Sequence, residues 1–343
     1  MHARDVVRAW GAILSGRPPV LSIEVTRECP LRCPGCYAYE PDHIAGHAGL
    51  RTLADYKGDS LVKRAIELVD RVRPLHVSLV GGDPLVRFRE MEALVPQILA
   101  RDIHVQLVTS AFRPPAPEWA AMRRMTIAVS IDGLPAEHDV RRAPATYDRI
   151  LKNIAGSRVT IHSTITSQMF SRPGYLEEFV AFWSPRPEIQ RIWFSLFTPQ
   201  RGATDAEILT PAQRVQAIEE LTELRLRYPK LDMSSRLLPE FLNPPSSPAN
   251  CIFSKVTETL SADLTSRVTP CQFGGDPDCS QCGCIASMGM AAVGHYKLGG
   301  IVPLGSIFKA SVKVGQLRAQ RRRPHVPAID APAPVPAGVS NPE

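Results

Sequence analysis

The 343-residue chain lacks any long hydrophobic run: no stretch approaches the roughly 18 consecutive apolar residues that a membrane-spanning helix needs. Its first residues, MHARDVVRAWGAILSGRPP, carry Arg and Asp where a signal peptide would have an apolar region. Both observations predict a cytoplasmic location. Hydrophobic residues still make up 44% of the chain, which is enough for one large buried core, alone or with a small second domain.

The chain also lacks a sustained basic face with interleaved aromatic residues. Its net charge is only +6, and part of this comes from the segment LRAQRRRP at 317–324, which we interpret as a solvated basic tail. Nucleic-acid binding is therefore not expected.

Cysteine is absent from the whole middle of the chain. The eight cysteines form two groups, three in the first and five in the second: Cys29, Cys33 and Cys36; and Cys251, Cys271, Cys279, Cys282 and Cys284. In a reducing compartment such clustering indicates metal binding rather than a disulfide framework.

Between the two groups, short runs rich in β-branched residues alternate with amphipathic helical patterns. The expected strands are residues 19–26, 75–81, 104–110, 126–132, 159–165 and 192–197. The expected helices are residues 59–72, 91–102, 146–155, 174–183 and 210–229, the last with Thr210 as N-cap and Pro211 at the first helical position.

Six strand-helix units in succession predict an α/β fold, a partial (β/α)6 barrel with parallel strands, followed by a small cysteine-rich auxiliary domain. We expect an N-terminal amphipathic helix in 1–18, the partial barrel in 19–235, the auxiliary domain in 236–310 with a hairpin at 257–271, and a tail in 311–343. The tail is basic and then rich in Pro and Ala, so we expect its end to be disordered.

Three thiols without a fourth are the unusual feature of ECPLRCPGCYAY at 28–39. A site built from cysteine alone usually closes with four ligands, so Cys29, Cys33 and Cys36 either borrow a distant ligand or leave a coordination position open. A zinc site would need a fourth ligand such as His43 or His47.

The three cysteines follow the first expected strand, at the rim where β/α barrels form ligand sites. GGDP at 81–84 follows the second strand, and its two glycines let the backbone approach a ligand closely. SIDG at 130–133 closes the fourth strand, and Arg142 comes twelve residues after Ser130. Three motifs from separate strands thus converge on one face.

This ordered set of motifs resembles the radical S-adenosylmethionine (SAM) enzymes over roughly residues 20–200. The resemblance implies that Cys29, Cys33 and Cys36 hold three irons of a 4Fe-4S cluster whose fourth iron stays open for SAM. It also implies reductive cleavage of SAM to methionine and a 5'-deoxyadenosyl radical, with an electron from an external donor such as flavodoxin or ferredoxin.

The same resemblance implies further cofactor-binding residues. Gly81, Gly82 and Asp83 correspond to the family's Gly-Gly-Glu-Pro loop at the methionine amino group, with Asp in place of Glu. Ser130 and Arg142 match the serine and arginine that hold the methionine carboxylate in relatives of the sulfatase-maturing enzymes, and Arg141 is the competitor of Arg142. Tyr37 resembles the aromatic residue that borders the adenine.

The second cysteine group resembles the auxiliary domain of SPASM or twitch type. This implies that Cys251, Cys271, Cys279 and Cys282 hold a second, auxiliary 4Fe-4S cluster, with Cys284 as the alternative to Cys282. Zinc is the other reading, because four cysteines at these spacings satisfy it equally well.

Three classes of function follow. The first is a radical SAM oxidoreductase or transferase acting on a small-molecule or lipid-like substrate; the second is a radical maturase of a peptide or protein; the third is a non-catalytic zinc or iron-sulfur scaffold. Two basic amphipathic segments, 3–15 and 305–323, could rest on an anionic membrane surface or pack on the barrel. His104, His162 and Tyr296 are candidate substrate contacts by polarity alone.

Overall fold

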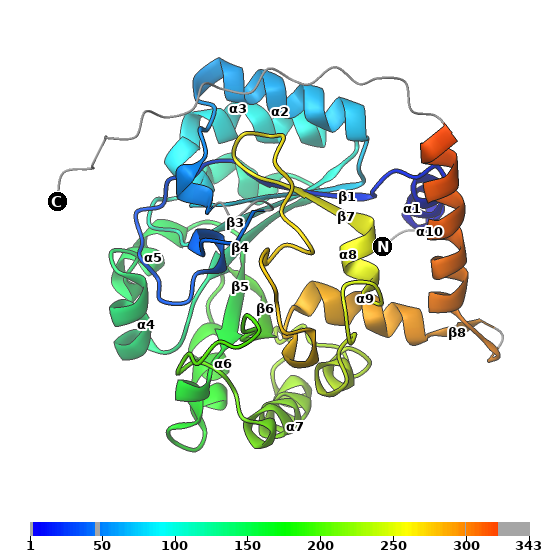
Figure 1. Ribbon diagram of the computed structural model, residues 1–343. Coiled ribbons are helices and arrows are strands. Elements are labelled where there is room, and N and C mark those ends of the chain that lie inside the picture. Colours follow the sequence, from blue (N-terminus) through cyan, green and yellow to red (C-terminus); the bar gives the residue numbers. More distant parts are fainter. Residues whose placement is uncertain (1–2, 45–48, 299, 322–343) are drawn as a thin grey trace.

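The protein, seen in a computed structural model that describes residues 3–44, 49–298 and 300–321, is built on an open parallel sheet. Seven strands lie in the order β6-β5-β4-β3-β2-β1-β7, and all neighbours are parallel (Figure 1). The strands are β1 (Val20–Glu24), β2 (His76–Val80), β3 (His104–Thr109), β4 (Met125–Ser130), β5 (Val159–Ile165), β6 (Ile189–Leu196) and β7 (Thr257–Leu260). The fold class is therefore α/β, as predicted.

Helices connect the strands in the manner of right-handed β/α units. Those between β1 and the end of the barrel segment are α2 (Gly58–Val72), α3 (Phe88–Leu99), α4 (Pro135–Arg142), α5 (Tyr147–Ile154), α6 (Tyr175–Trp183) and α7 (Pro211–Arg227). The others are α1 (Ala3–Leu14), α8 (Ile252–Val256), α9 (Ile285–His295) and α10 (Leu304–Arg321), and a short antiparallel pair joins β8 (Lys297–Leu298) to β9 (Val302–Pro303).

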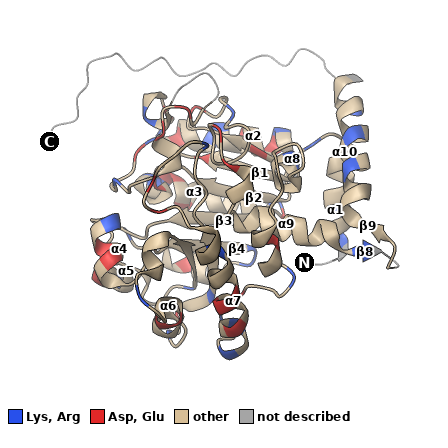
Figure 2. Cartoon of the chain, turned by 60° about the horizontal axis from the view of Figure 1, so that its bottom comes forward, with Lys and Arg blue, Asp and Glu red and all other residues tan. Residues whose placement is uncertain are grey.

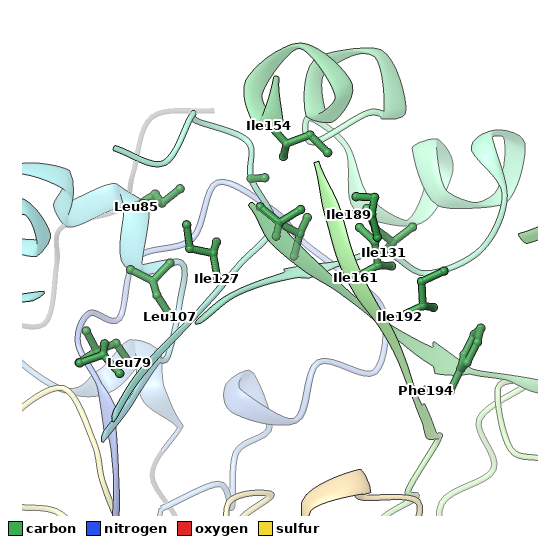
Figure 3. Packing of buried hydrophobic residues seen from close by; sticks show 14 of the residues in the cluster. Leu79, Leu85, Leu107, Ile127, Ile131, Ile154, Ile161, Ile189, Ile192 and Phe194 are labelled. Atoms are coloured by element: carbon green, nitrogen blue, oxygen red, sulfur yellow. The ribbon is translucent and has the colours of Figure 1, made fainter. Parts of the chain in front are cut away.

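The main core lies between the sheet and these helices. Ile23, Leu79, Leu107 and Ile127 stand in register on four neighbouring strands, and all are buried (Figure 3). The alternate residues point to the other face, which carries polar side chains in register: Ser22, Ser78, Gln106 and Thr126. Because side chains alternate along a strand, the apolar face holds the helices and the polar face is left for a ligand.

The six predicted strands are confirmed, with bounds that differ by up to three residues. The prediction did not include β7, which pairs with β1 and comes from the segment expected to form the auxiliary domain. The expected hairpin is present only as a tight turn, in which Ser261 N donates to Ser266 O and Val268 N donates to Thr259 O. The division into four domains stays a prediction, but residues 257–260 belong to the main sheet.

The N-terminal amphipathic helix packs against α10 beside β1 and β7 (Figure 1). The Trp10 ring meets Phe308 edge-on at 5.9 Å, and Trp10 Nε1 donates to Ser311 Oγ. The expected helix in 210–229 is confirmed as α7, where Thr210 and Gln213 form a reciprocal capping box. No helix within the described residues is long and apolar enough to cross a membrane. The end of the tail, 322–343, lies outside them.

Candidate functional site

The first cysteine loop follows β1 and is fastened to its neighbours just before Cys29. Arg87 Nη1 donates to the carboxylate of Glu28 at 2.9 Å, and Arg87 Nη2 donates to that of Asp55 at 2.9 Å. The hydrogen bond from Arg87, assisted by Lys57, lowers the pKa of Glu28 to about 2. Glu28, at the start of the loop, is therefore ionised and paired with Arg87, which holds this end of the loop in place.

The glycine loop after β2 packs directly on the same segment. Asp83 N donates to Glu28 O at 2.9 Å. A Cβ on Gly82, whose φ is +31°, would come within 2.0 Å of Glu28 O, and one on Gly81, whose φ is +82°, within 2.3 Å of the Glu24 Cβ. Both glycines are thus required by close backbone approach.

Asp83 itself is turned away from any ligand. It is 2% exposed, and its carboxylate accepts from Leu85 N, Thr109 Oγ1, Ser110 N and Ser110 Oγ at 2.6 to 3.0 Å. These donors occupy the acceptor positions of both oxygens. The Asp83 side chain is therefore engaged within the protein, and cofactor contacts at Gly81, Gly82 and Asp83 stay a prediction.

Ser130 and Arg142 lie at the ends of β4 and α4. Arg142 Nε donates to the carboxylate of Asp132 at 2.7 Å, and Arg141 Nε to the same carboxylate at 3.1 Å. Burial alone would raise the pKa of Asp132, but Arg142 and Arg141 lower it to about 2. Asp132 thus has a structural role.

Apart from the shared Asp132 carboxylate, Arg141 and Arg142 interact with partly different groups. Arg141 also donates through Nη1 to Glu207. Burial opposes the positive charge of Arg142, but Asp132 and then the thiols of Cys33 and Cys36 raise its pKa. The charges of both arginines act on Cys33, with that of Arg142 the larger, and Arg141 is in addition held between two carboxylates.

His162 stands beside Ser130 on the polar face of the sheet. The two residues are partners in the β4-β5 register, and His162 Nε2 lies 2.9 Å from Ser195 Oγ on β6. Although the residue is half-buried, its ring nitrogens are enclosed, and burial lowers the pKa of His162 to about 4. A neutral hydrogen-bonding ring is thus available next to Ser130.

The second cysteine group converges on one apolar cavity, which we call the cysteine cavity. All five of its cysteines line this cavity: Cys251, Cys271, Cys279, Cys282 and Cys284. Cys251 begins α8 and Cys284 begins α9, and the two sulfurs accept from Ser254 N and Ser287 N respectively. Gln272 Nε2 also donates to Cys284 Sγ at 3.1 Å.

The segment 271–284 spans the gap between the two edges of the open sheet. Near β6, Leu196 N donates to Gly283 O at 2.9 Å and Asp278 N donates to Pro199 O at 2.9 Å. Near β1, Gly275 N donates to Asp42 O at 3.0 Å. The second cysteine group thus lies over the side of the barrel that the strands leave open.

A buried clasp joins this segment to the loop that follows the first cysteine group. His43 Nε2 lies 2.6 Å from Glu24 Oε1, and His43 Nδ1 lies 3.2 Å from Phe273 O. Because both ring nitrogens are engaged, His43 is not free to be the fourth ligand of a zinc site. The other ligand considered, His47, lies outside the described residues.

Tyr37 stands at the meeting point of the two cysteine groups. Its ring meets Phe273 edge-on at 5.2 Å and lies 5.7 Å from His43. Although Tyr37 is 36% exposed, loss of water around its hydroxyl raises the pKa of Tyr37, and Cys36, Glu24, Cys284 and Cys271 raise it further. The hydroxyl is therefore close to thiols of both groups.

The chemistry of the thiols fits iron-sulfur ligation. All eight cysteines are free, and burial raises the pKa of Cys29 to about 12, with Cys33 and Cys36 near enough to add to the shift. In the described part of the chain, no group of three or more His, Cys, Asp or Glu side chains converges on one metal ion. Thiolates of a four-iron cluster bind different iron atoms and need not converge on one point.

Two further residues that the sequence offered as substrate contacts lie elsewhere in the fold. His104 starts β3 at the amino edge of the sheet, where Arg124 Nη1 contacts it, and Tyr296 follows α9 with Arg236 over its ring. Neither is near the cysteines' rim. Sequence reasoning missed Glu24, whose only signal was its place at the end of β1.

Comparison with known proteins agrees with this geometry. Residues 23–178, a little under half of the chain, match the sequence model described as the Radical SAM superfamily. No curated protein matches the chain.

Solved structures of two other proteins, SuiB and anSMEcpe, are among those that share the fold. Streptococcus suis SuiB bound to precursor peptide SuiA is 16% identical, with a TM-score of 0.53 over 92% of this chain and 70% of SuiB. The enzyme anSMEcpe with bound AdoMet is 15% identical, with a TM-score of 0.52 over 74% of this chain and 75% of its own. A structure of anSMEcpe that also holds the Cp18Cys peptide has a TM-score of 0.53 at 14% identity over 74% of each chain.

Proposed function

We propose that the chain is a radical SAM enzyme in which Cys29, Cys33 and Cys36 hold a 4Fe-4S cluster and bind SAM at its open iron. The observation that carries this proposal is the junction of three rim loops: the cysteine loop after β1, the glycine loop after β2 and the α4 arginines after β4. Hydrogen bonds from Asp83 N to Glu28 O and the charge effect of Arg142 on Cys33 and Cys36 join the three.

When bound, the cluster and SAM supply one-electron cleavage of a carbon-sulfur bond, which the protein alone has no group to perform. The chain's own residues bind and orient. Gly81 and Gly82 let the glycine loop pack against residues 24–28 of the cysteine loop, and both are partly exposed. Arg142, held by Asp132 at 2.7 Å, offers a planar cation suited to the methionine carboxylate, beside Ser130.

We further propose that Cys251, Cys271, Cys279 and Cys282 hold an auxiliary 4Fe-4S cluster. All four line the cysteine cavity, and after burial the Cys251 and Cys279 thiols are among the neighbours that raise the pKa of Cys282. Cys284 is also buried and lines the cavity, and its sulfur accepts from Ser287 N as the Cys251 sulfur accepts from Ser254 N. We assign Cys282 by its Cys-x2-Cys spacing to Cys279 and keep Cys284 as the alternative.

The proposed substrate is held between the two cysteine groups, on the polar face of the sheet. His162 and Ser195 offer a hydrogen-bonding pair there, and Ile285 N, next to Cys284, donates to Ser195 Oγ at 3.3 Å. Segment 271–284 covers the open side of this space. A small-molecule or lipid-like substrate remains one class for this space.

A peptide substrate is the second class, and the comparisons favour it. SuiB is recorded with its precursor peptide and anSMEcpe with the Cp18Cys peptide, and each shares this fold. The two amphipathic helices give less support to a lipid, because Trp10 and Ile13 are used to pack α1 on Phe308 and Val312 of α10. An external one-electron donor is required by either class.

The experiment is anaerobic reconstitution followed by two measurements: iron and sulfide per chain, and 5'-deoxyadenosine formed from SAM with dithionite. We expect about eight irons in the wild type and about four in a Cys29/Cys33/Cys36→Ala variant, with deoxyadenosine from the wild type only. A Cys251/Cys271/Cys279/Cys282→Ala variant should also keep about four irons.

Two outcomes would contradict the proposal. Zinc in place of iron, with no SAM cleavage, would leave the scaffold function. Wild-type iron that persists in the first-group variant, together with deoxyadenosine formation, would show that those three cysteines are not the SAM-binding ligands.

A further inference from the structure

A basic hollow lies on the outer side of the second cysteine group. It measures about 340 Å³ and lies between the end of α1, α8, β7, α10 and the turn at 267–272. Arg17, Lys255 and Arg267 are the cations in its lining, and all three are exposed. Glu258 is the one acid among the lining residues, and Arg267 pairs with it at 2.6 Å.

Helix α10 extends this positive surface. Lys309 and Lys313 are exposed and lie three residues before Val312 and Gln316, which line the hollow, so each stands roughly 60° round the helix from a lining residue. No Asp or Glu occurs between Asp278 and Asp330, and Figure 2 shows basic but no acidic residues along α10. We call Arg17, Lys255, Arg267, Lys309 and Lys313 the basic rim.

The hollow and the cysteine cavity share a wall. Four residues line both: Phe253, Ser254, Cys271 and Gln272. Cys271 therefore faces the surface hollow on one side and the other four cysteines on the other. Gln272 links the same wall to Cys284 through a 3.1 Å hydrogen bond. A redox group in the cavity would be one side chain away from a positively charged surface.

We propose that the basic rim docks an acidic one-electron carrier protein, which delivers its electron to the second cysteine group at Cys271. This inference rests on the proposed function, because it assigns an iron-sulfur cluster to that group. In the transfer the carrier would lose one electron and the second cluster would gain it and pass it on to the first cluster, where SAM cleavage consumes it; no bond forms or breaks in the transfer itself.

Charge complementarity decides the kind of partner. Cations that border a concave surface steer an acidic protein into a productive orientation and raise its association rate, an effect that salt weakens. The hollow is lined by polar groups such as Thr257, Thr269 and Gln316 around the Cys271 wall, which suits a protein edge rather than a lipid chain.

The first test measures binding and does not depend on catalysis. Purified flavodoxin is titrated into the reconstituted chain by calorimetry at low and high salt. The rim variant is Arg17→Glu/Lys255→Glu/Lys313→Glu. The control, Lys63→Glu/Arg123→Glu/Lys152→Glu, makes the same change in net charge at exposed residues outside the hollow. We expect the rim variant to bind flavodoxin on the order of tenfold more weakly than the wild type, and the control variant to bind it as the wild type does. High salt should weaken flavodoxin binding by the wild type and by the control.

The second test separates this inference from the proposed function. Dithionite needs no docking site, so the rim variant should form deoxyadenosine with dithionite as the wild type does, but lose most of its formation with reduced flavodoxin. If the wild type forms no deoxyadenosine with dithionite, the proposed function fails. The calorimetry would then still show whether the basic rim binds flavodoxin.

Two results would overturn the inference. One is a rim variant that binds flavodoxin and accepts its electrons as well as the control does. The other is an unchanged flavodoxin affinity combined with lost binding to phosphatidylglycerol vesicles or to a poly-glutamate peptide, which would assign the rim to a membrane or to an acidic peptide.

Discussion

His43 and Glu24 form a fully buried pair, with His43 Nε2 2.6 Å from Glu24 Oε1, and this pair ties the two cysteine loops together. Glu24 ends β1 and also accepts from Ser261 Oγ at 2.5 Å, in the turn after β7. His43 Nδ1 faces a carbonyl oxygen and must therefore carry a proton. One imidazole thus bridges the first strand and the segment that holds the second cysteine group.

Breaking this pair should destabilise the fold. A Glu24→Ala variant leaves His43 without its buried carboxylate, and we expect the free energy of unfolding to fall by about 3 kcal/mol or more. Urea unfolding of the metal-free chain is the measurement. The control is Glu178→Ala, which removes the exposed pair with Arg172 and should cost far less. Equal losses of unfolding free energy in the two variants would show that the buried His43–Glu24 pair stabilises the fold no more than an exposed ion pair does.

Gly82 should not tolerate a side chain. In Gly82→Ala the new Cβ would collide with Glu28 O, displacing the cysteine loop. Gly156→Ala is the matched control, since its φ of +74° is also positive but nothing lies within 4 Å of a new Cβ. We expect the first variant to lose most of its SAM binding, measured by equilibrium dialysis after reconstitution, and the second to keep it. Wild-type SAM affinity in Gly82→Ala would exclude this loop from the SAM site.

Arg142 and Arg141 should have separable effects. Arg142 acts more strongly than Arg141 on Cys33 and also acts on Cys36, so Arg142→Gln should weaken SAM binding by roughly tenfold or more, the usual cost of losing a charged hydrogen bond to a carboxylate. Arg141→Gln should lower stability through its lost contact with Glu207 but leave SAM affinity within a few fold. The reverse pattern would assign the carboxylate to Arg141.

Cys282 and Cys284 should differ in iron content. Cys282→Ala is expected to lose the second cluster, about four irons per chain, whereas Cys284→Ser is expected to keep about eight and to preserve the cap on Ser287 N. Iron and sulfide analysis of the two reconstituted variants is the measurement. Loss of iron in Cys284→Ser alone would make Cys284 the ligand.

His162 should make stability depend on pH in a defined window. Its folded pKa of about 4 lies below the ordinary value of about 6.5, so the unfolded chain takes up the proton first and stability falls as pH drops from 6.5 towards 4. Between pH 7 and pH 5 we expect the metal-free wild type to lose about 1 to 2 kcal/mol more than His162→Gln. Equal pH dependence in urea unfolding would mean that the ring is not held neutral.

The strands and the first cysteine loop were predictable because local pattern determines them. Short β-branched runs such as β3 and β5, and a capped helix start such as Thr210 in α7, depend on neighbouring residues in sequence. The role of Asp83 was not predictable, because the donors that occupy its carboxylate come from Thr109 and Ser110 at the end of another strand. Helix α4 was missed, since its sequence is dominated by charged residues with little apolar periodicity.

The sequence by itself determined the chemistry of this protein: three thiols on one rim loop, glycines at the next strand end, an arginine at the fourth, and five thiols near the C-terminus. Only the tertiary structure decided how these parts meet. It added β7 beside β1, set segment 271–284 across the open side of the sheet, and engaged His43 with Glu24 instead of a metal. The physical reason is that buried polar groups must find partners, and the partners available to Glu24, Asp83 and Asp132 come from chain segments that only folding brings together.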